Sequence, residues 1–526
     1  MDTWYNAGPL EDLVAAGRRV IKHGGKQVAL FHDGNGGALA CNNRCPHEGY
    51  PLAEGCLSAD GRLTCNWHNW KFDLRTGAAE VGGDAVRVYP TAVRDGAVWI
   101  DLTDPDPEEI RAAALAGLKE SFRDHDFGRM VRETARLEKA GGSPRDALAA
   151  AIAWTHDRFE YGMTHALGAA PDWLALGDRY ATDAATRLIP YVETIGYLCW
   201  DSLREPAYPF IEARLPWDEA AFAAAVEAEN EGRAVALVRG ALGAGLAYAD
   251  LEPALTRAAL AHYQDYGHAL IYTCKAGELV AALGPDVAEP VTLALVRGLV
   301  SASREDLIPE FKAYAPTLAA WEAGEGGADP VTAADFRGLG VERALARALA
   351  SARHPDLFDA LLGASARALL HYDLAVQDRT DGPVSANVGW LGFTHMLTFA
   401  DAARRLGAGR PDPWSRVLLQ MACFLGRTAK YCDWTQDTAG WAVAEPRAFL
   451  DGVLAGLFDH GQPEYIVSAH LVKVGLAVDA LFTDRPDAPW APDLLAAHNR
   501  FLHEPFKRKH LLRAVRQSLG FVANEG

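Results

Sequence analysis

Hydrophobic and polar positions follow two different patterns along the 526-residue chain, and the change falls near residue 102. Before it, short apolar runs end in turns that contain Gly or Asp, as in KQVALFHDGNGGALACNN and AVRVYPTAVRDGAVWIDL. Asp-Gly and Asn-Gly pairs favour tight hairpins because glycine accepts a positive φ angle. Residues 1–102 are therefore predicted to form a small antiparallel β domain.

From residue 103 on, the pattern becomes helical. TDPDPEEIRAAALAGL predicts a linker and then a helix start, with Asp106 as the cap and Pro107 as the first helical residue. After it, Ala and Leu recur at helical spacing, with Gly and Pro between the segments. Residues 103–526 are predicted to form one large all-α domain, so the expected fold is multidomain, all-β and then all-α.

A histidine recurs early in four helical segments that have a similar pattern of residues. These segments are THALGAAPDWL, GHALIYTCKAGELVAAL, THMLTFADAARRL and AHLVKVGLAVDAL, and their histidines are His165, His268, His395 and His470. The irregular spacing between them excludes a solenoid repeat. A diverged internal duplication and a shared alanine-rich composition both explain the likeness, and both stay open.

Charge and targeting signals limit which binding partners and which cellular location we expect. The net charge is −18, whereas nucleic acids and anionic membranes require clustered Lys and Arg, so we expect neither as a partner. The start of the chain, MDTWYNAGPLEDL, lacks the regions of a secretory signal. No apolar run reaches the length of about 18 residues that predicts a spanning helix. We therefore expect a cytoplasmic protein, and we leave a homo-oligomer open.

Clustered cysteines and histidines carry the clearest chemical signal. The segment CPHEGYPLAEGCLSADGRLTCNWHNWKFDLRTG contains Cys45-x-His47 and, 17 residues later, Cys65-x2-His68. Two such loops can face each other and enclose two irons, one held by thiolates and the other by imidazoles. A zinc site is the alternative, but zinc fingers pair Cys with Cys and His with His.

These half-motifs, with the trailing WHNWKFDLRTG, resemble the Rieske [2Fe–2S] family over residues 3–102. The resemblance implies a one-electron carrier. Its expected cluster ligands are Cys45, His47, Cys65 and His68. Respiratory-type members have a further cysteine beside each half-motif, where this chain has Tyr50 and Trp67. The domain is therefore more similar to the ferredoxin and oxygenase branch.

The helical part offers candidates for a second metal site, although the D-x2-H-x4–5-H iron motif of familiar Rieske oxygenases is absent. His156 and Glu160 are four residues apart and could share a helix face. Asp265 and His268 are three apart, as in helical iron sites. The candidate ligands of a non-haem iron are His156, Glu160, His165, Asp265, His268, His395 and His470. A lone histidine on an apolar helix is more often a hydrogen-bonded core residue, and that alternative stays open.

HALIYTCKAGEL, THMLTFADAARRL and AHLVKVGLAVDAL are similar to segments of the questin-oxidase-like family, helical proteins associated with oxidation of aromatic polyketides. This resemblance implies oxygenase chemistry on a bulky hydrophobic molecule, although the fused Rieske domain departs from that family's pattern. No nicotinamide or flavin fingerprint occurs, since GALGAG at 240–245 has the wrong glycine spacing. Electrons are therefore expected from an external reductase or ferredoxin.

The sequence thus predicts an oxidoreductase whose Rieske cluster passes single electrons to a helical-domain iron. That iron would use O₂ to oxidise a small organic substrate, aromatic or polyketide-like. A function of a different class stays open. The protein would then be an electron carrier or redox sensor whose helical domain binds a ligand or partner without a second metal. Total iron per chain distinguishes the two.

Overall fold

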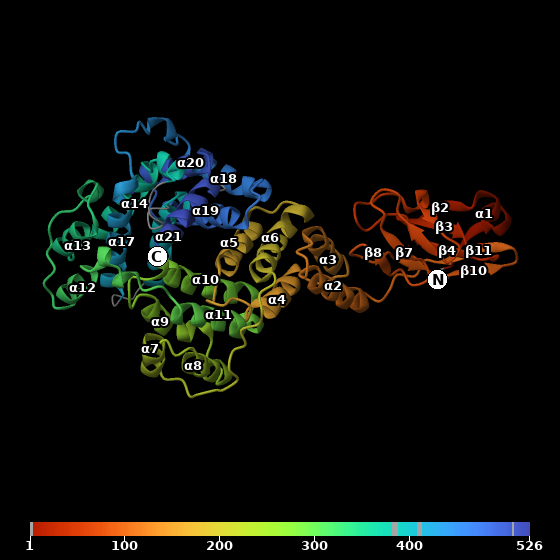
Figure 1. Ribbon diagram of the computed structural model, residues 1–526, viewed down its shortest axis with the longest axis horizontal. Coiled ribbons are helices and arrows are strands. Elements are labelled where there is room, and N and C mark those ends of the chain that lie inside the picture. Colours follow the sequence, from red (N-terminus) through yellow and green to blue (C-terminus); the bar gives the residue numbers. More distant parts are fainter. Residues whose placement is uncertain (1–3, 381–387, 408–412, 508–509, 526) are drawn as a thin grey trace. The chain divides into compact units, whose positions relative to one another are not determined.

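The computed structural model describes residues 4–380, 388–407, 413–507 and 510–525. The chain divides into two compact units, Met1–Ala147 and Leu148–Gly526. The eleven β-strands of the described residues all lie in the first unit, and helices dominate the second (Figure 1). The predicted fold class, an all-β domain followed by a large all-α domain, is confirmed.

Three antiparallel sheets and one short helix, α1 (Leu10–Ala16), build the β domain. One sheet has the order β1 (Trp4–Pro9), β11 (Ala97–Asp101), β10 (Thr91–Arg94). A second has the order β2 (Arg18–His23), β3 (Lys26–His32), β4 (Ala38–Asn42), β9 (Val88–Tyr89). The third has the order β5 (Cys56–Leu57), β6 (Arg62–Thr64), β7 (Lys71–Asp73), β8 (Ala79–Val81).

Strand β3 separates two hydrophobic cores. Its alternate residues face opposite sides, so Val28 and Leu30 join one core while Ala29 and Phe31 join the other. The second core also contains Cys45 and Cys65. The two cysteine loops are therefore anchored on a packed interior.

A predicted turn closes the hairpin of β10 and β11. Asp95 and Gly96 join the two strands, with φ angles of 50° and 74°. Both are left-handed conformations, which a two-residue hairpin of this kind requires and which Asp-Gly tolerates.

Helices α2 (Pro107–Ser121) and α3 (Phe127–Lys139) belong to the first unit rather than to the second. The predicted start of α2 is confirmed, because the side chain of Asp106 caps it and proline is its first residue. The strands end where the predicted domain division falls, after residue 102, whereas the compact unit continues through α3.

The remaining α-helices of the described residues follow one another along the chain. They are α4 (Pro144–Thr155), α5 (His165–Tyr180), α6 (Ala184–Ser202), α7 (Glu219–Glu227), α8 (Glu231–Gly243), α9 (Tyr248–Ala259), α10 (His268–Leu283), α11 (Ala288–Val300), α12 (Tyr314–Glu322), α13 (Val341–Ala350), α14 (Leu357–Leu370), α15 (Ala375–Asp378), α16 (Trp390–Gly407), α17 (Trp414–Thr428), α18 (Pro446–Gly456), α19 (Tyr465–Asp484), α20 (Ala491–His503) and α21 (Leu511–Ala523).

Helices α5, α10, α16 and α19 pack as a ring in which each contacts the next. Contacts at two levels show that neighbours run parallel: His268 lies beside His165 and His395 near the helix starts, and ion pairs join the same helices further along. Lys275 and Asp172, each the eighth residue of its helix, are 2.8 Å apart. Arg405 of α16 pairs with Glu278 of α10 at 3.0 Å, one layer further along. The amino-terminal ends of the four helices therefore lie at one end of the bundle.

One helix of the bundle has an unusually apolar composition. By length and composition alone, α19 could cross a membrane, with a mean hydropathy of 1.6, although 78% of this window is buried inside the protein. The helix contains no uninterrupted apolar run of about 18 residues, so the search for such runs in the sequence does not identify it. Its burial is that of a core helix.

Candidate functional site

Two loops of the β domain share one hydrogen-bond pattern. In the loop after β4, the backbone N–H of Cys45 donates to Tyr50 O, and Gly49 N–H donates to Cys45 O. In the loop between β6 and β7, Cys65 N–H donates to Trp70 O, and Asn69 N–H donates to Cys65 O. A left-handed residue, Gly49 or Asn69, closes each loop. The loops are therefore structural equivalents that present equivalent side chains.

The side chains of these loops form a compact donor set. The Nδ1 atoms of His47 and His68 are 3.0 Å apart, and the side chains of Cys45 and Cys65 are buried beside each other. Burial is the largest cause that raises the pKa of Cys45, to about 11, and the neighbouring Cys65 raises it further. Buried thiols give up their protons when a metal binds them. Two sulfurs and two Nδ1 atoms at this spacing match a cluster ligated by two cysteines and two histidines.

Two tryptophans flank the histidine pair. Trp70 stacks on the ring of His47 and Trp67 on the ring of His68, each with 4.9 Å between ring centroids. Trp67 is exposed, as is His68. The imidazole side of the donor set therefore lies at the surface of the β domain, while the sulfur side faces its core.

Helix α3 reaches the same loops through a buried ion-pair network. Asp84, which is 4% exposed, accepts hydrogen bonds from Arg132 Nε at 3.1 Å and from both terminal nitrogens of Arg136. The Nη1 atom of Arg132 also lies 3.5 Å from the carbonyl oxygen of His47. The guanidinium group of Arg132 is thus held beside a candidate cluster ligand.

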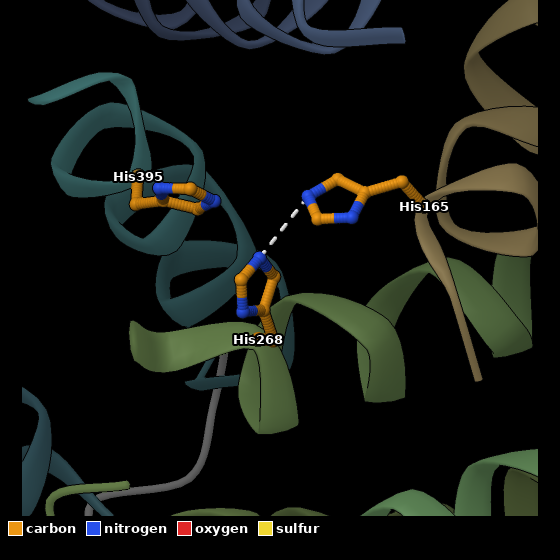
Figure 2. A group of neighbouring side chains, drawn as sticks. All are labelled: His165, His268 and His395. Carbon is orange, nitrogen blue, oxygen red and sulfur yellow. Dashed lines mark hydrogen bonds between the residues drawn. The ribbon is translucent and has the colours of Figure 1, made fainter. Parts of the chain in front are cut away.

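In the helical unit, histidines from three helices converge. Ligand atoms of His165, His268 and His395 all lie within 4.8 Å of one another, and Nε2 of His268 is 3.2 Å from Nε2 of His165 (Figure 2). The ring of His470 completes the group, with centroids 4.9 Å from His165 and 5.2 Å from His395. Each histidine lies in the first two turns of one helix of the parallel bundle.

Hydrogen bonds leave ring nitrogens of this group free to bind a metal. His268 Nδ1 is 2.7 Å from the carbonyl oxygen of Asp265, and His470 Nδ1 is 2.7 Å from that of Ile466. If both Nδ1 atoms donate, the Nε2 lone pairs remain free. His470 Nε2 and both ring nitrogens of His395 are buried without a partner of ordinary hydrogen-bond geometry among the described residues. Buried unpartnered nitrogens are costly unless a ligand or metal pairs with them.

The surroundings favour the neutral form of three of these imidazoles, those of His165, His395 and His470. Burial, followed by the charges of neighbouring groups, lowers the pKa of His165 and of His395 well below the usual value. Burial and the nearby Lys473 lower the pKa of His470 to about 3. Metals bind the neutral imidazole, so the group is prepared for ligation at physiological pH.

A strained segment presents His268. Asp265, Tyr266 and Gly267 have consecutive φ angles of 48°, 54° and 79°, all left-handed. The backbone N–H of Tyr266 donates to Glu305 Oε2, and Arg427 lies over the Tyr266 ring at 3.8 Å. Left-handed conformations of non-glycine residues persist where surrounding contacts enforce them, and they cluster at functional sites.

A layer of charged residues lies below the histidines. Lys275 bonds Asp172 and Glu278, each at 2.8 Å. In contrast, Nζ of Lys473 is buried with no hydrogen-bond partner in the described part of the chain, 5.4 Å from the centre of the Tyr272 ring. Burial is the largest cause that lowers the pKa of Lys473, to about 8. The centre is therefore lined by imidazole nitrogens and by one amine whose pKa is lowered.

Comparison with known proteins identifies the first unit. The family model of the Rieske [2Fe–2S] domain matches residues 3–90. The ferredoxin subunit of 3-phenylpropionate/cinnamic acid dioxygenase from Photorhabdus laumondii is 32% identical over 97 residues, which are 18% of this chain and 90% of that protein. The chain belongs to the Rieske [2Fe–2S] family. The cofactor of its Rieske domain is a [2Fe–2S] cluster, and the donor set described above fits it.

Other relatives of the Rieske domain are parts of larger enzymes. The 4beta-methylsterol monooxygenase of Methylococcus capsulatus is 32% identical over 96 residues, 16% of this chain and 26% of that protein. Dicamba monooxygenase bound to dicamba is a similar solved structure, 28% identical over 20% of this chain and 33% of that one, with a TM-score of 0.18. The chain spans between 18% and 26% of the length of the first curated relatives that it matches.

Two predicted candidates lie outside the histidine group. The expectation that His156 and Glu160 share a helix face is wrong, because α4 ends at Thr155. His156 instead stacks on Phe210, with 5.8 Å between the ring centroids, and its Nδ1 is 3.1 Å from Ala153 O. No ligand geometry joins this histidine and glutamate.

Asp265 contributes differently from what its spacing predicts. It precedes α10 in a 3₁₀ turn, so the helical carboxylate-x-x-His arrangement does not form. Its carbonyl oxygen, not its carboxylate, holds the His268 ring; the carboxylate Oδ1 is 3.8 Å from Nδ1. Sequence reasoning missed Lys473, although a lysine three residues after His470 in an apolar helix is itself a signal of a special environment.

Proposed function

We propose that the protein is a Rieske-dependent oxygenase that uses O₂ and electrons from an external ferredoxin or reductase to oxidise an organic substrate. The observation that carries this proposal is the convergence of four imidazoles at one end of a parallel bundle, in a chain that also has a one-electron carrier. A mononuclear iron would supply O₂ activation at the bundle, and the Rieske cluster would supply single electrons.

In this proposal, each group of side chains has a distinct task. The cluster ligands in the β domain are Cys45, His47, Cys65 and His68. The iron ligands in the bundle are His165, His268, His395 and His470. The relatives support the oxidoreductase class, because their names include a monooxygenase and the ferredoxin subunit of a dioxygenase. The exposed imidazole edge of the β domain is suited to receive electrons from a separate donor.

The electrostatics of the bundle favour a substrate with an anionic oxygen. Four imidazole ligands would bring no negative charge to a bound metal, and four helix amino-termini add positive potential at the same end. A phenolate or enolate oxygen would be stabilised there, which fits an aromatic or polyketide-like substrate. His165 and His268 are only partly buried, so access to the centre is expected from their side.

Counting iron tests the proposal. The purified chain should contain about three irons, two in the cluster and one in the bundle. His395→Ala should lower the count to about two and leave the absorption of the cluster unchanged. His498→Ala is the matched control, because His498 on α20 is also buried and neither of its ring nitrogens has a hydrogen-bond partner among the described residues. Two irons in the unmodified chain, with no O₂ consumption, would instead favour an electron carrier or redox sensor.

A further inference from the structure

A cavity of about 260 Å³ lies in the helical unit, lined by residues of α14, α17, α20 and the 3₁₀ turn Ala333–Phe336. A single water needs only about 10–15 Å³ of such volume, so the cavity is large enough for a small organic molecule. None of the four histidines of the bundle centre lines it. Arg337, one of its lining residues, is exposed, so a ligand can enter from solvent.

Hydrogen-bond donors gather in the wall of this cavity. The indole Nε1 of Trp434 is buried and has no hydrogen-bond partner in the described part of the chain. Nε of Arg367 donates to Asp493 Oδ2 at 2.6 Å, which leaves both terminal nitrogens of that side chain for another acceptor. Arg337 donates through one terminal nitrogen to Trp434 O at 3.2 Å. A buried donor without a partner is costly, so a ligand that accepts from the indole is expected.

The charges around the cavity favour an anion. Its wall contains two guanidinium groups, of Arg337 and Arg367, and one carboxylate, of Asp493. Burial is the largest cause that lowers the pKa of the lining residue His371, and the charges of Arg337 and Arg500 lower it further. A hydrogen bond to a backbone carbonyl and the charge of Asp493 act in the opposite direction. The cavity is therefore electropositive, although the net charge of the chain is −18.

The rest of the wall is apolar. Phe336, Leu370 and Leu425 line it together with several alanines. Small-molecule sites typically combine apolar walls with a few polar groups that fix the orientation of the ligand. An inorganic anion would leave the apolar wall without contacts, and a hydrocarbon would leave the donors without acceptors. A molecule with one anionic group on an apolar body satisfies both parts of the wall.

We propose that this cavity binds a small organic carboxylate, held by the indole N–H of Trp434 and by the guanidinium groups of Arg337 and Arg367. The planar fork of an arginine matches the two oxygens of a carboxylate. The apolar body of the ligand then contacts the side chains of Phe336 and Leu425. The proposal is independent of the oxygenase function, because neither the cluster ligands nor the histidines of the bundle take part.

Isothermal titration of the full chain with benzoate tests the site. We expect saturable binding of one benzoate per chain, and benzamide, which has nearly the same shape without the charge, should bind about tenfold more weakly. Trp434→Phe keeps an aromatic ring but removes the indole N–H, so it should weaken benzoate binding about tenfold. The matched control is Trp390→Phe, since Trp390 Nε1 is also buried without a partner among the described residues but does not line the cavity.

Arg337→Gln covers the case in which Trp434→Phe disturbs folding, because Arg337 is exposed. It should weaken the binding of benzoate several-fold and leave that of benzamide unchanged. Both variants should keep the iron content of the unmodified chain, whatever its value, which separates this test from that of the oxygenase function. Absent benzoate binding, equal binding of benzoate and benzamide, or benzoate binding that neither variant changes would overturn the proposal. So would tighter binding of inorganic phosphate than of benzoate.

Discussion

At the scale of single residues, the helical unit places ionisable groups where burial decides their protonation. His165, His395 and His470 are kept neutral, which suits metal binding. At Asp201 of α6, whose side chain accepts a hydrogen bond from Thr164, burial acts on a carboxyl group instead of an imidazole. Burial raises the pKa of Asp201 to about 6, so its charged form is disfavoured in the folded protein.

The shift at Asp201 makes stability fall as pH rises. The folded state holds the proton more tightly than the unfolded state, whose carboxyl titrates near 4, so folding loses free energy between about pH 4 and pH 6. Asp201→Asn removes this penalty and should stabilise the protein by about 1–2 kcal/mol at pH 7.5, with little effect at pH 4. Urea unfolding at both pH values measures the difference. An asparagine variant that is less stable at pH 7.5 would contradict the assignment.

At the scale of elements, α3 belongs with the Rieske domain, because its arginines neutralise Asp84 and reach the backbone of His47. Local sequence predicts α3 as one helix among many, since Arg at helical spacing normally indicates a solvated face. The buried partner is a single aspartate between β8 and β9, more than forty residues earlier. Its importance is visible only once the helix and the strands are packed together.

The charge of Arg132 should raise the reduction potential of the cluster. A nearby positive charge favours the reduced, more negative state, so Arg132→Gln should lower the midpoint potential, and Asp84→Asn should raise it. Arg123→Gln, at a side chain 84% exposed in the same unit, is the control for net charge. Spectroelectrochemical titration gives the three potentials. Shifts of the same sign in Arg132→Gln and Asp84→Asn would indicate loosening of the loop rather than an effect of charge.

At the scale of the whole molecule, the two compact units need not divide where the sequence pattern changes. The unit that holds the Rieske domain continues to Ala147, beyond the last strand. A fragment of residues 1–147 should fold, bind two irons and resist urea better than a fragment of residues 1–102. The physical reason is Asp84, whose ion pairs with Arg132 and Arg136 the shorter fragment would lack. Equal stability of the two fragments would show that α2 and α3 contribute nothing to the domain.

The sequence by itself determined the features that depend on neighbouring residues. Turns, helix caps and the two loops around Cys45 and Cys65 form through contacts within a few positions, so the change from β to α and the Rieske half-motifs are readable along the chain. The sequence also predicts that each of the four candidate histidines lies early in a helix. It could not show that His156 and Glu160 fall beyond the end of α4, because a helix boundary depends on packing as well as on pattern.

Only the tertiary structure decided which histidines meet and what holds the last helix in place. His165 and His268 are separated by 103 positions, and they converge because charged layers align parallel helices at one level. Arg513 holds α21 in place through hydrogen bonds to the carbonyl oxygens of Val376, Gln377 and Arg379, which lie more than 130 positions earlier in the chain. Both outcomes depend on contacts between segments far apart in the chain, which a periodic pattern does not encode.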